Sequence, residues 1–78
     1  MQEFEIEIQS FQQVQDFVAL ASEQPFDVRV GNERQQINGK DLMGMFSLDY
    51  SRPLMVRIKC QAPEGLPFRR QVEELLTV

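Results

Sequence analysis

Hydrophobic and polar residues alternate at the start of the chain, over residues 2–8. Phe4, Ile6 and Ile8 fall on one side of an extended strand, and three glutamates fall on the other. This period of two residues predicts a strand with one buried face. From residue 10 the spacing becomes helical, and the predicted helix ends before Pro25. Its expected apolar face is formed by Phe11, Val14, Phe17, Val18 and Ala21.

The middle of the chain is predicted to form a β-hairpin and then a short helix. Residues 26–30 alternate, and Gly31 and Asn32 follow them as residues that tolerate a positive φ. A second strand returns through Ile37. A short helix is expected over about residues 40–48, and a turn over residues 49–53.

The last third of the chain predicts one more strand and one more helix. Residues 54–60 alternate again, residues 61–65 read as a loop, and Pro67 suits the first turn of a helix. The apolar stripe of that helix is Phe68, Val72, Leu75 and Leu76. The predicted order is therefore β-α-β-β-α-β-α. Because each strand has one apolar and one charged face, we expect an α+β fold with an antiparallel sheet covered by helices on one side.

Charges on the solvent face of the predicted sheet also indicate which strands are neighbours. The first strand carries three glutamates, whereas the second and fourth carry Arg29, Arg57 and Lys59. Opposite charges on adjacent strands are favourable and like charges are costly. The first strand should therefore lie beside a basic strand, most simply the fourth.

Composition restricts the classes of function. The 78 residues make one domain, 1–78, with a net charge of -4 and no block of Lys or Arg, so nucleic acid and anionic membranes are not expected partners. There is one cysteine, Cys60, and neither a signal peptide nor a membrane span is evident, which favours the cytoplasm. The chain has no histidine, no metal-ligand spacing and no phosphate-binding glycine loop. We therefore expect no enzymatic activity, no cofactor and no metal.

One segment, "INGKDLMGMFSL", resembles a motif of HPr, the histidine-containing phosphocarrier of the bacterial sugar phosphotransferase system. The HPr motif reads approximately "vnaKSimGvmsL", and Lys40, Gly44, Ser47 and Leu48 stand at matching positions. The resemblance extends over essentially the whole chain through the order of its elements. It implies the HPr-like open-faced sandwich, with four antiparallel strands in the order 1-4-2-3 and three helices on one face.

The chain departs from HPr at both sites of phosphorylation. The "HARP"-like run that holds the phosphorylated histidine corresponds here to Ser10, Phe11, Gln12 and Gln13, so the phosphoryl acceptor, its arginine and its proline are absent. Ser10 keeps a hydroxyl at a helix N-terminus, as a cap or beside an anion. The serine that HPr kinase phosphorylates is replaced by Asp41, which can mimic phosphoserine, cap the short helix, or do both.

The segment around Asp41 is rich in apolar side chains. Helical spacing turns Met45 and Leu48 toward the sheet, and the resemblance implies that Leu42, Met43 and Phe46 form an exposed patch that meets partners. The alternative is that all five belong to the core of a small domain. On the first hypothesis the partner-binding residues are Ser10, Gln12, Lys40, Asp41, Leu42, Met43 and Phe46.

Three functions follow from this sequence. The first is a non-catalytic HPr-like module in carbon-catabolite regulation. It would dock through the first two helices onto enzyme I, an enzyme IIA domain, HPr kinase or a LacI-type regulator. The second is a phosphocarrier whose acceptor has been replaced, and the third is an oligomerisation module that reuses the fold.

Overall fold

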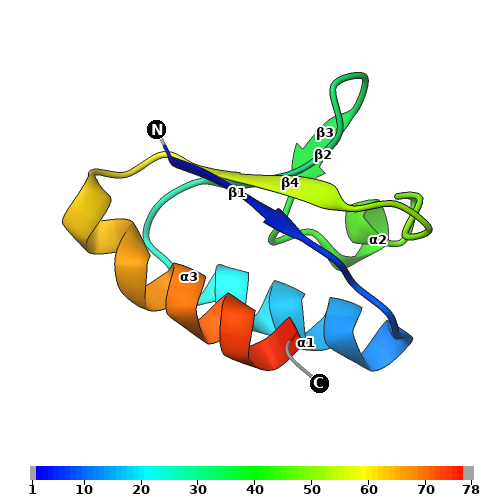
Figure 1. The fold of residues 1–78 in the computed structure, drawn as a ribbon, viewed down its shortest axis with the longest axis horizontal. Helices are drawn as coiled ribbons and strands as arrows, with labels where there is room; N and C mark the ends of the chain where they lie inside the picture. Colours follow the sequence, from blue (N-terminus) through cyan, green and yellow to red (C-terminus); the bar gives the residue numbers. More distant parts are fainter. Residues whose placement is uncertain (1, 77–78) are drawn as a thin grey trace.

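Four strands form one antiparallel sheet, and helices pack on one of its faces (Figure 1). The computed structural model describes residues 2–76, without the side chains of residues 62 and 63. The elements in chain order are β1 (Gln2–Ile6), α1 (Phe11–Ser22), β2 (Val28–Gly31), β3 (Gln36–Asn38), α2 (Leu42–Met45), β4 (Leu54–Ile58) and α3 (Ala62–Leu76). This is the predicted β-α-β-β-α-β-α order, so the α+β fold is confirmed.

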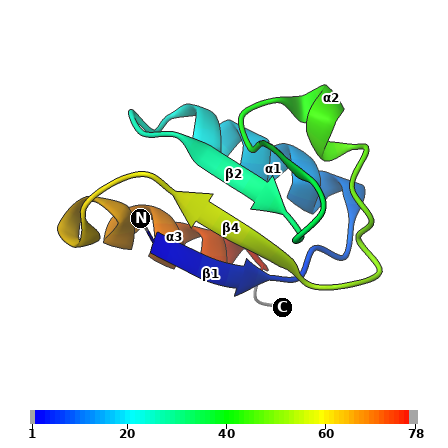
Figure 2. The same cartoon turned by 90° about the horizontal axis from the view of Figure 1, so that it is seen from above.

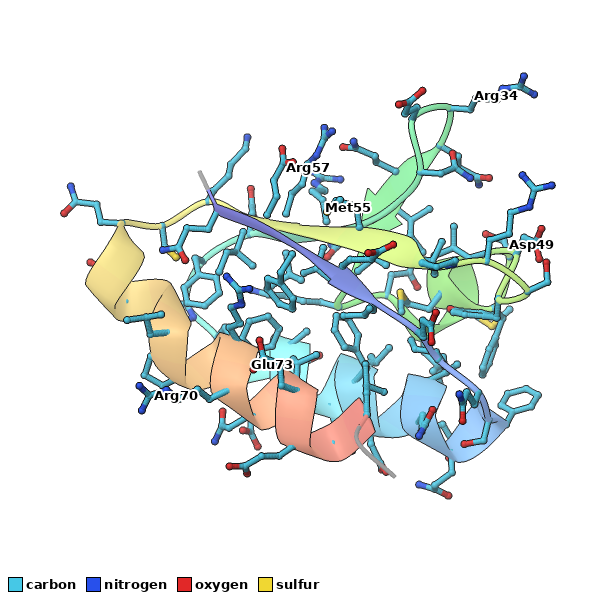
Figure 3. All side chains as sticks on the ribbon, viewed as in Figure 1. Arg34, Asp49, Met55, Arg57, Arg70 and Glu73 are labelled. Carbon is cyan, nitrogen blue, oxygen red and sulfur yellow. The ribbon has the colours of Figure 1, made fainter. Side chains whose placement is uncertain are left out.

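The strand order is β1-β4-β2-β3, as predicted. β4 runs antiparallel to both β1 and β2, and Glu3 of β1 lies opposite Arg57 of β4 in the register. Arg57 Nε lies 3.1 Å from Glu3 Oε1, so the two side chains form an ion pair. The geometry of the Nε–H group does not meet the criteria of a hydrogen bond to this oxygen. Figure 3 shows Arg57 and Met55 on the open face, away from the helices. The opposite charges predicted to bring β1 and β4 together do meet there.

The core lies between the sheet and helices α1 and α3, which run side by side beneath it (Figures 1 and 2). Phe68 of α3 is fully buried at its centre, with the rings of Phe4, Phe17 and Phe26 around it at centroid distances of 6.4, 6.1 and 5.8 Å. These aromatic contacts join α3 to β1, α1 and the segment before β2. They hold the two long helices in fixed positions under the sheet.

The hairpin turn differs from the prediction. Gly31 belongs to β2, and no residue that the structure describes has a positive φ. The turn is made instead by Asn32, whose Oδ1 accepts hydrogen bonds from the backbone N–H groups of Arg34 (2.8 Å) and Gln35 (2.9 Å). An asparagine side chain can direct a turn in this way without a left-handed residue.

The last helix begins earlier than predicted. It starts at Ala62, so Pro67 lies inside α3 and residues 62–65 are helical. Gly65 explains the difference, because a Cβ added there would lie 2.6 Å from Ile58 Cδ1 and 2.8 Å from Cys60 Sγ. The glycine is needed for close packing against the end of β4 and does not end a helix here.

Three other elements are shorter than the sequence pattern predicts. β1 ends at Ile6 although Ile8 is still buried, β4 ends at Ile58, and α2 spans four residues of the nine expected. The predicted stripe of the last helix is confirmed at Phe68 and Val72, which are buried. Residue 1 and residues 77–78 of the predicted domain lie outside the described residues.

Candidate functional site

The candidate site lies where the start of α1 meets α2, at the end of the sheet (Figures 1 and 2). Both helices begin with a side-chain cap. Ser10 Oγ accepts a hydrogen bond from the Gln13 N–H (3.2 Å), and Asp41 Oδ1 accepts one from the Met43 N–H (3.2 Å). The capping roles predicted for Ser10 and Asp41 are therefore confirmed. Whether Asp41 also acts as a phosphoserine mimic stays a prediction.

The cap of α1 contains a second bond that the sequence pattern could have revealed. Gln13 Oε1 accepts a hydrogen bond of 2.7 Å from the backbone N–H of Gln9. Ser10 and Gln13 thus form a variant of the capping box, whose S-x-x-Q signature is present in the sequence. The two bonds fix the entry of the chain from β1 into α1, and with it the direction of the first residue of the helix.

That first residue, Phe11, does not lie on the apolar face predicted for it. Its side chain is 67% exposed, whereas Val14, Phe17, Val18 and Ala21 are buried as expected. The Phe11 ring packs edge-on against Phe46, with centroids 4.6 Å apart and planes at 66°. Phe11 is therefore a residue of the candidate site that the sequence analysis assigned to the core.

The short helix α2 divides its apolar side chains as the helical spacing predicts. Met45 and Leu48 are buried, Met43 is 77% exposed and Phe46 is 37% exposed. The alternative in which all five apolar residues belong to the core is therefore wrong. The exposed position expected for Leu42 is also wrong in part, because Leu42 is half-buried and packs against the core.

We define the exposed apolar patch as Phe11, Met43 and Phe46. Met43 and Phe46 are three residues apart at α2 and its C-cap, which places them on the same side of the helix. Phe46 in turn contacts Phe11 of α1. The patch therefore continues from one helix to the other.

A hollow of about 540 Å³ adjoins the patch. Its lining residues are Ile8, Gln9, Ser10, Phe11, Val14, Phe46 and Tyr50. Each of these described lining residues is uncharged, and most are apolar. A hollow of this size and composition fits an apolar group of a ligand or a partner.

Tyr50 forms the wall of the hollow beyond α2, and the sequence analysis did not identify it. Its hydroxyl donates a hydrogen bond to the Met45 carbonyl, which holds the turn after α2 against the helix. Burial raises the pKa of Tyr50 to about 12. The neutral phenol is therefore the form that lines the hollow at ordinary pH.

Two predicted partner-binding residues are engaged within the protein. Lys40 Nζ donates a hydrogen bond of 2.8 Å to the Gln24 carbonyl, which ties the segment before α2 to the segment after α1. Gln12 is exposed, and its Nε2 donates to Asp16 Oδ1 at 2.9 Å on the outer face of α1. Of the seven predicted residues, Met43 and Phe46 are the ones whose apolar side chains are presented to solvent.

The site presents apolar side chains to solvent where α1 begins and α2 ends. The chain has no histidine, and the hydroxyl of Ser10 stands at the N-cap of α1. Among residues 2–76, no cluster of Cys, Asp and Glu is arranged to hold a metal ion. None of the helices described is long and apolar enough to cross a membrane. The free Cys60 lies away from the site. The pKa of its thiol is raised chiefly by burial and, to a smaller extent, by the negative charge of the nearby Glu64.

Comparison with protein-family models finds no match, and neither does comparison with curated proteins. Among solved structures, the chain is similar to an HPr from Thermoanaerobacter tengcongensis, with a TM-score of 0.79 and 23% sequence identity. The similarity covers 97% of this chain and 91% of that one. The predicted resemblance to HPr is thus confirmed at the level of the fold, and the protein has the HPr fold.

Proposed function

We propose that this protein is an HPr-like binding module that docks onto other proteins through α1 and α2 and transfers no phosphoryl group. The observation that carries the proposal is the exposed apolar patch beside the position where HPr holds its histidine. Phe11 and Phe46 are exposed there, although a small domain has few large apolar side chains with which to fill its core. Exposed apolar clusters of this kind mark contact surfaces between proteins.

Two residues support a role without chemistry. Ser10 stands in place of the phosphoryl acceptor, and its Oγ accepts the capping hydrogen bond from Gln13. Asp41 gives the start of α2 a fixed negative charge where HPr carries a serine that kinases phosphorylate. A fixed charge there resembles the regulated state of HPr in sign, although it is smaller than the charge of a phosphate.

The test is a calorimetric titration against enzyme I, an enzyme IIA domain, HPr kinase and a LacI-type catabolite regulator. We expect one of these proteins to bind, and Phe46→Ala to weaken that binding tenfold or more, as truncation of a central aromatic anchor does. Met55→Ala on the open face of the sheet is the matched control, because Met55 is 36% exposed, about as much as Phe46. The absence of binding to all four proteins would reject the proposal.

The competing function, a phosphocarrier with a replaced acceptor, makes a different prediction. Incubation with phosphoenolpyruvate and enzyme I would then add one phosphoryl group, about 80 Da, to the intact protein. We expect no such addition. A modified peptide that contains Ser10 would instead support the phosphocarrier.

A further inference from the structure

We propose that Met43 is a site of reversible oxidation by peroxide, whose product makes the exposed apolar patch polar and so weakens docking. The modification depends on this chain alone, whereas its effect on docking rests on the proposed function. Met43 is the most exposed of the three patch residues, at 77% against 67% for Phe11 and 37% for Phe46. Its thioether therefore lies where a small oxidant dissolved in water can reach it.

The described methionines differ widely in their access to solvent. Met45 lies two residues after Met43 in the same short helix, on its opposite side, and is fully buried. Met55 lies on the open face of the sheet (Figure 3) and is 36% exposed. Because the oxidant must touch the sulfur, we expect Met43 to react first, Met55 more slowly, and Met45 last.

The surroundings of Met43 allow this change without damage to the fold. The Met43 N–H donates a hydrogen bond to Asp41 Oδ1, which holds the backbone in the cap of α2 whatever the state of the sulfur. The hydrophobic core includes Met45, and Leu42 packs against it, whereas the Met43 side chain faces solvent. A polar sulfoxide at Met45 would lie in the core, but at Met43 it changes only the surface.

The reaction is an oxygen transfer that conserves atoms and electrons. A lone pair of the Met43 sulfur attacks one oxygen of hydrogen peroxide, the O–O bond breaks, and the S–O bond of the sulfoxide forms. The sulfur loses two electrons, and the other peroxide oxygen gains them and leaves as water with both protons. Two thiols of a methionine sulfoxide reductase can reverse the change, since they become a disulfide while the oxygen leaves as water.

The sulfoxide opposes docking because it binds water. A partner that covers the patch would have to remove that water from the S–O group, and burial of a polar group without a hydrogen bond costs free energy. Phe11 and Phe46 stay apolar and keep their ring contact. Docking should therefore be weakened and not abolished.

Oxidation rates in the folded protein test the site. Dilute hydrogen peroxide at neutral pH is followed by tryptic digestion and tandem mass spectrometry, which separates Met43 from Met45 within the peptide of residues 41–52. We expect Met43 to react faster than Met55, and at least about tenfold faster than Met45. Urea should remove these differences by unfolding the chain. Cys60 falls in another peptide, and a repeat with Cys60→Ser removes its thiol as a competing target.

Hydrophobic interaction chromatography reads the patch without any partner. The oxidised protein should elute earlier, with an unchanged circular dichroism spectrum, and methionine sulfoxide reductase should restore its retention. Met43→Leu should lose most of this response, and Met55→Leu is the matched control that should keep it. Against the partner found by titration, oxidation should weaken binding roughly fivefold in the wild type and in Met55→Leu, but not in Met43→Leu.

Each arm of the experiment can overturn the proposal. Equal oxidation of Met43 and Met45 in the folded protein would do so, as would loss of the fold when Met43 is oxidised, or unchanged retention. A partner that binds the oxidised protein as tightly as the reduced one would reject the control of docking and leave the proposed function intact. Selective oxidation with altered retention, in a protein that binds none of the four partners, would uphold the modification while the proposed function and its control fail.

Discussion

Phe11 and Phe46 pack edge to face with ring centroids 4.6 Å apart, and this contact connects the first residue of α1 to the C-cap of α2. Both rings remain accessible to solvent, in contrast to the buried rings around Phe68. The protein therefore contains two aromatic clusters with different roles. One holds the core together, and the other forms an exposed apolar surface where α1 meets α2.

Truncating a ring in each cluster should lower stability by very different amounts. Phe68→Ala should lower the free energy of unfolding by about 3–5 kcal/mol, because it removes a fully buried ring that touches three others. Phe11→Ala should lower it by only about 0.5–1.5 kcal/mol, the usual value of an aromatic pair that is not buried. Urea denaturation of both variants measures the difference. Equal losses would mean that Phe11 supports the core.

Substitutions at Asp41 separate its capping role from its charge. Asp41→Asn keeps a side-chain oxygen for the Met43 N–H and removes the negative charge, whereas Asp41→Ala removes both. If Asp41 is mainly a cap, Asn should be nearly neutral and Ala should cost about 0.5–2 kcal/mol of stability. Thermal or urea unfolding gives these values.

The same pair of variants tests the phosphoserine mimic. Binding to the protein partner found by titration should weaken in Asp41→Asn as much as in Asp41→Ala if the charge is recognised. Asp41→Glu is the control that keeps the charge. If Asp41→Asn binds the partner as tightly as the wild type does, and only the destabilised Asp41→Ala binds more weakly, the role of Asp41 is capping.

Tyr50 predicts a loss of stability in alkaline solution. Its pKa is about 12 in the folded protein, above the ordinary value of 10.0, because burial disfavours the phenolate. The unfolded chain therefore releases this proton first, and the stability that the neutral phenol contributes is present below pH 10 and is lost as the pH rises through about 12. Tyr50→Phe should remove this part of the pH dependence.

Absorbance near the tyrosinate band can follow this titration directly, because Tyr50 is the single tyrosine and the chain has no tryptophan. The folded wild type should titrate well above the free amino acid. An ordinary tyrosine pKa would show that the ring of Tyr50 is not buried in the folded protein.

Two glycines in helices predict opposite responses to alanine. Gly65→Ala should destabilise the protein by about 1–3 kcal/mol, because the new Cβ would lie 2.6 Å from Ile58 Cδ1. Gly44→Ala should leave stability unchanged or raise it by up to about 1 kcal/mol, because its nearest contact is the movable Asp41 Oδ2 at 3.1 Å. Denaturation midpoints of the two variants, measured together, check the contrast. A stable Gly65→Ala protein would contradict the close approach of α3 to β4.

The sequence by itself determined the order of the elements, the faces of the strands and most core residues of the long helices. It did so because a buried face must repeat every two residues in a strand and every three or four in a helix. The opposite charges of Glu3 and Arg57 also indicated which strands are neighbours. The two helix caps, Ser10 and Asp41, could be read from residue type and position.

Only the tertiary structure decided the residues whose environment depends on distant parts of the chain. Phe11 has helical spacing with the core, yet it is exposed, because the first residue of α1 lies beside α2 and not under the sheet. A glycine is needed at position 65 inside α3 because the side chains of Ile58 and Cys60 occupy the space that a Cβ would take. The Lys40 side chain is directed to the Gln24 carbonyl, sixteen residues away in sequence. Periodicity identifies one face of each element, but the neighbour of that face is fixed only when the elements pack.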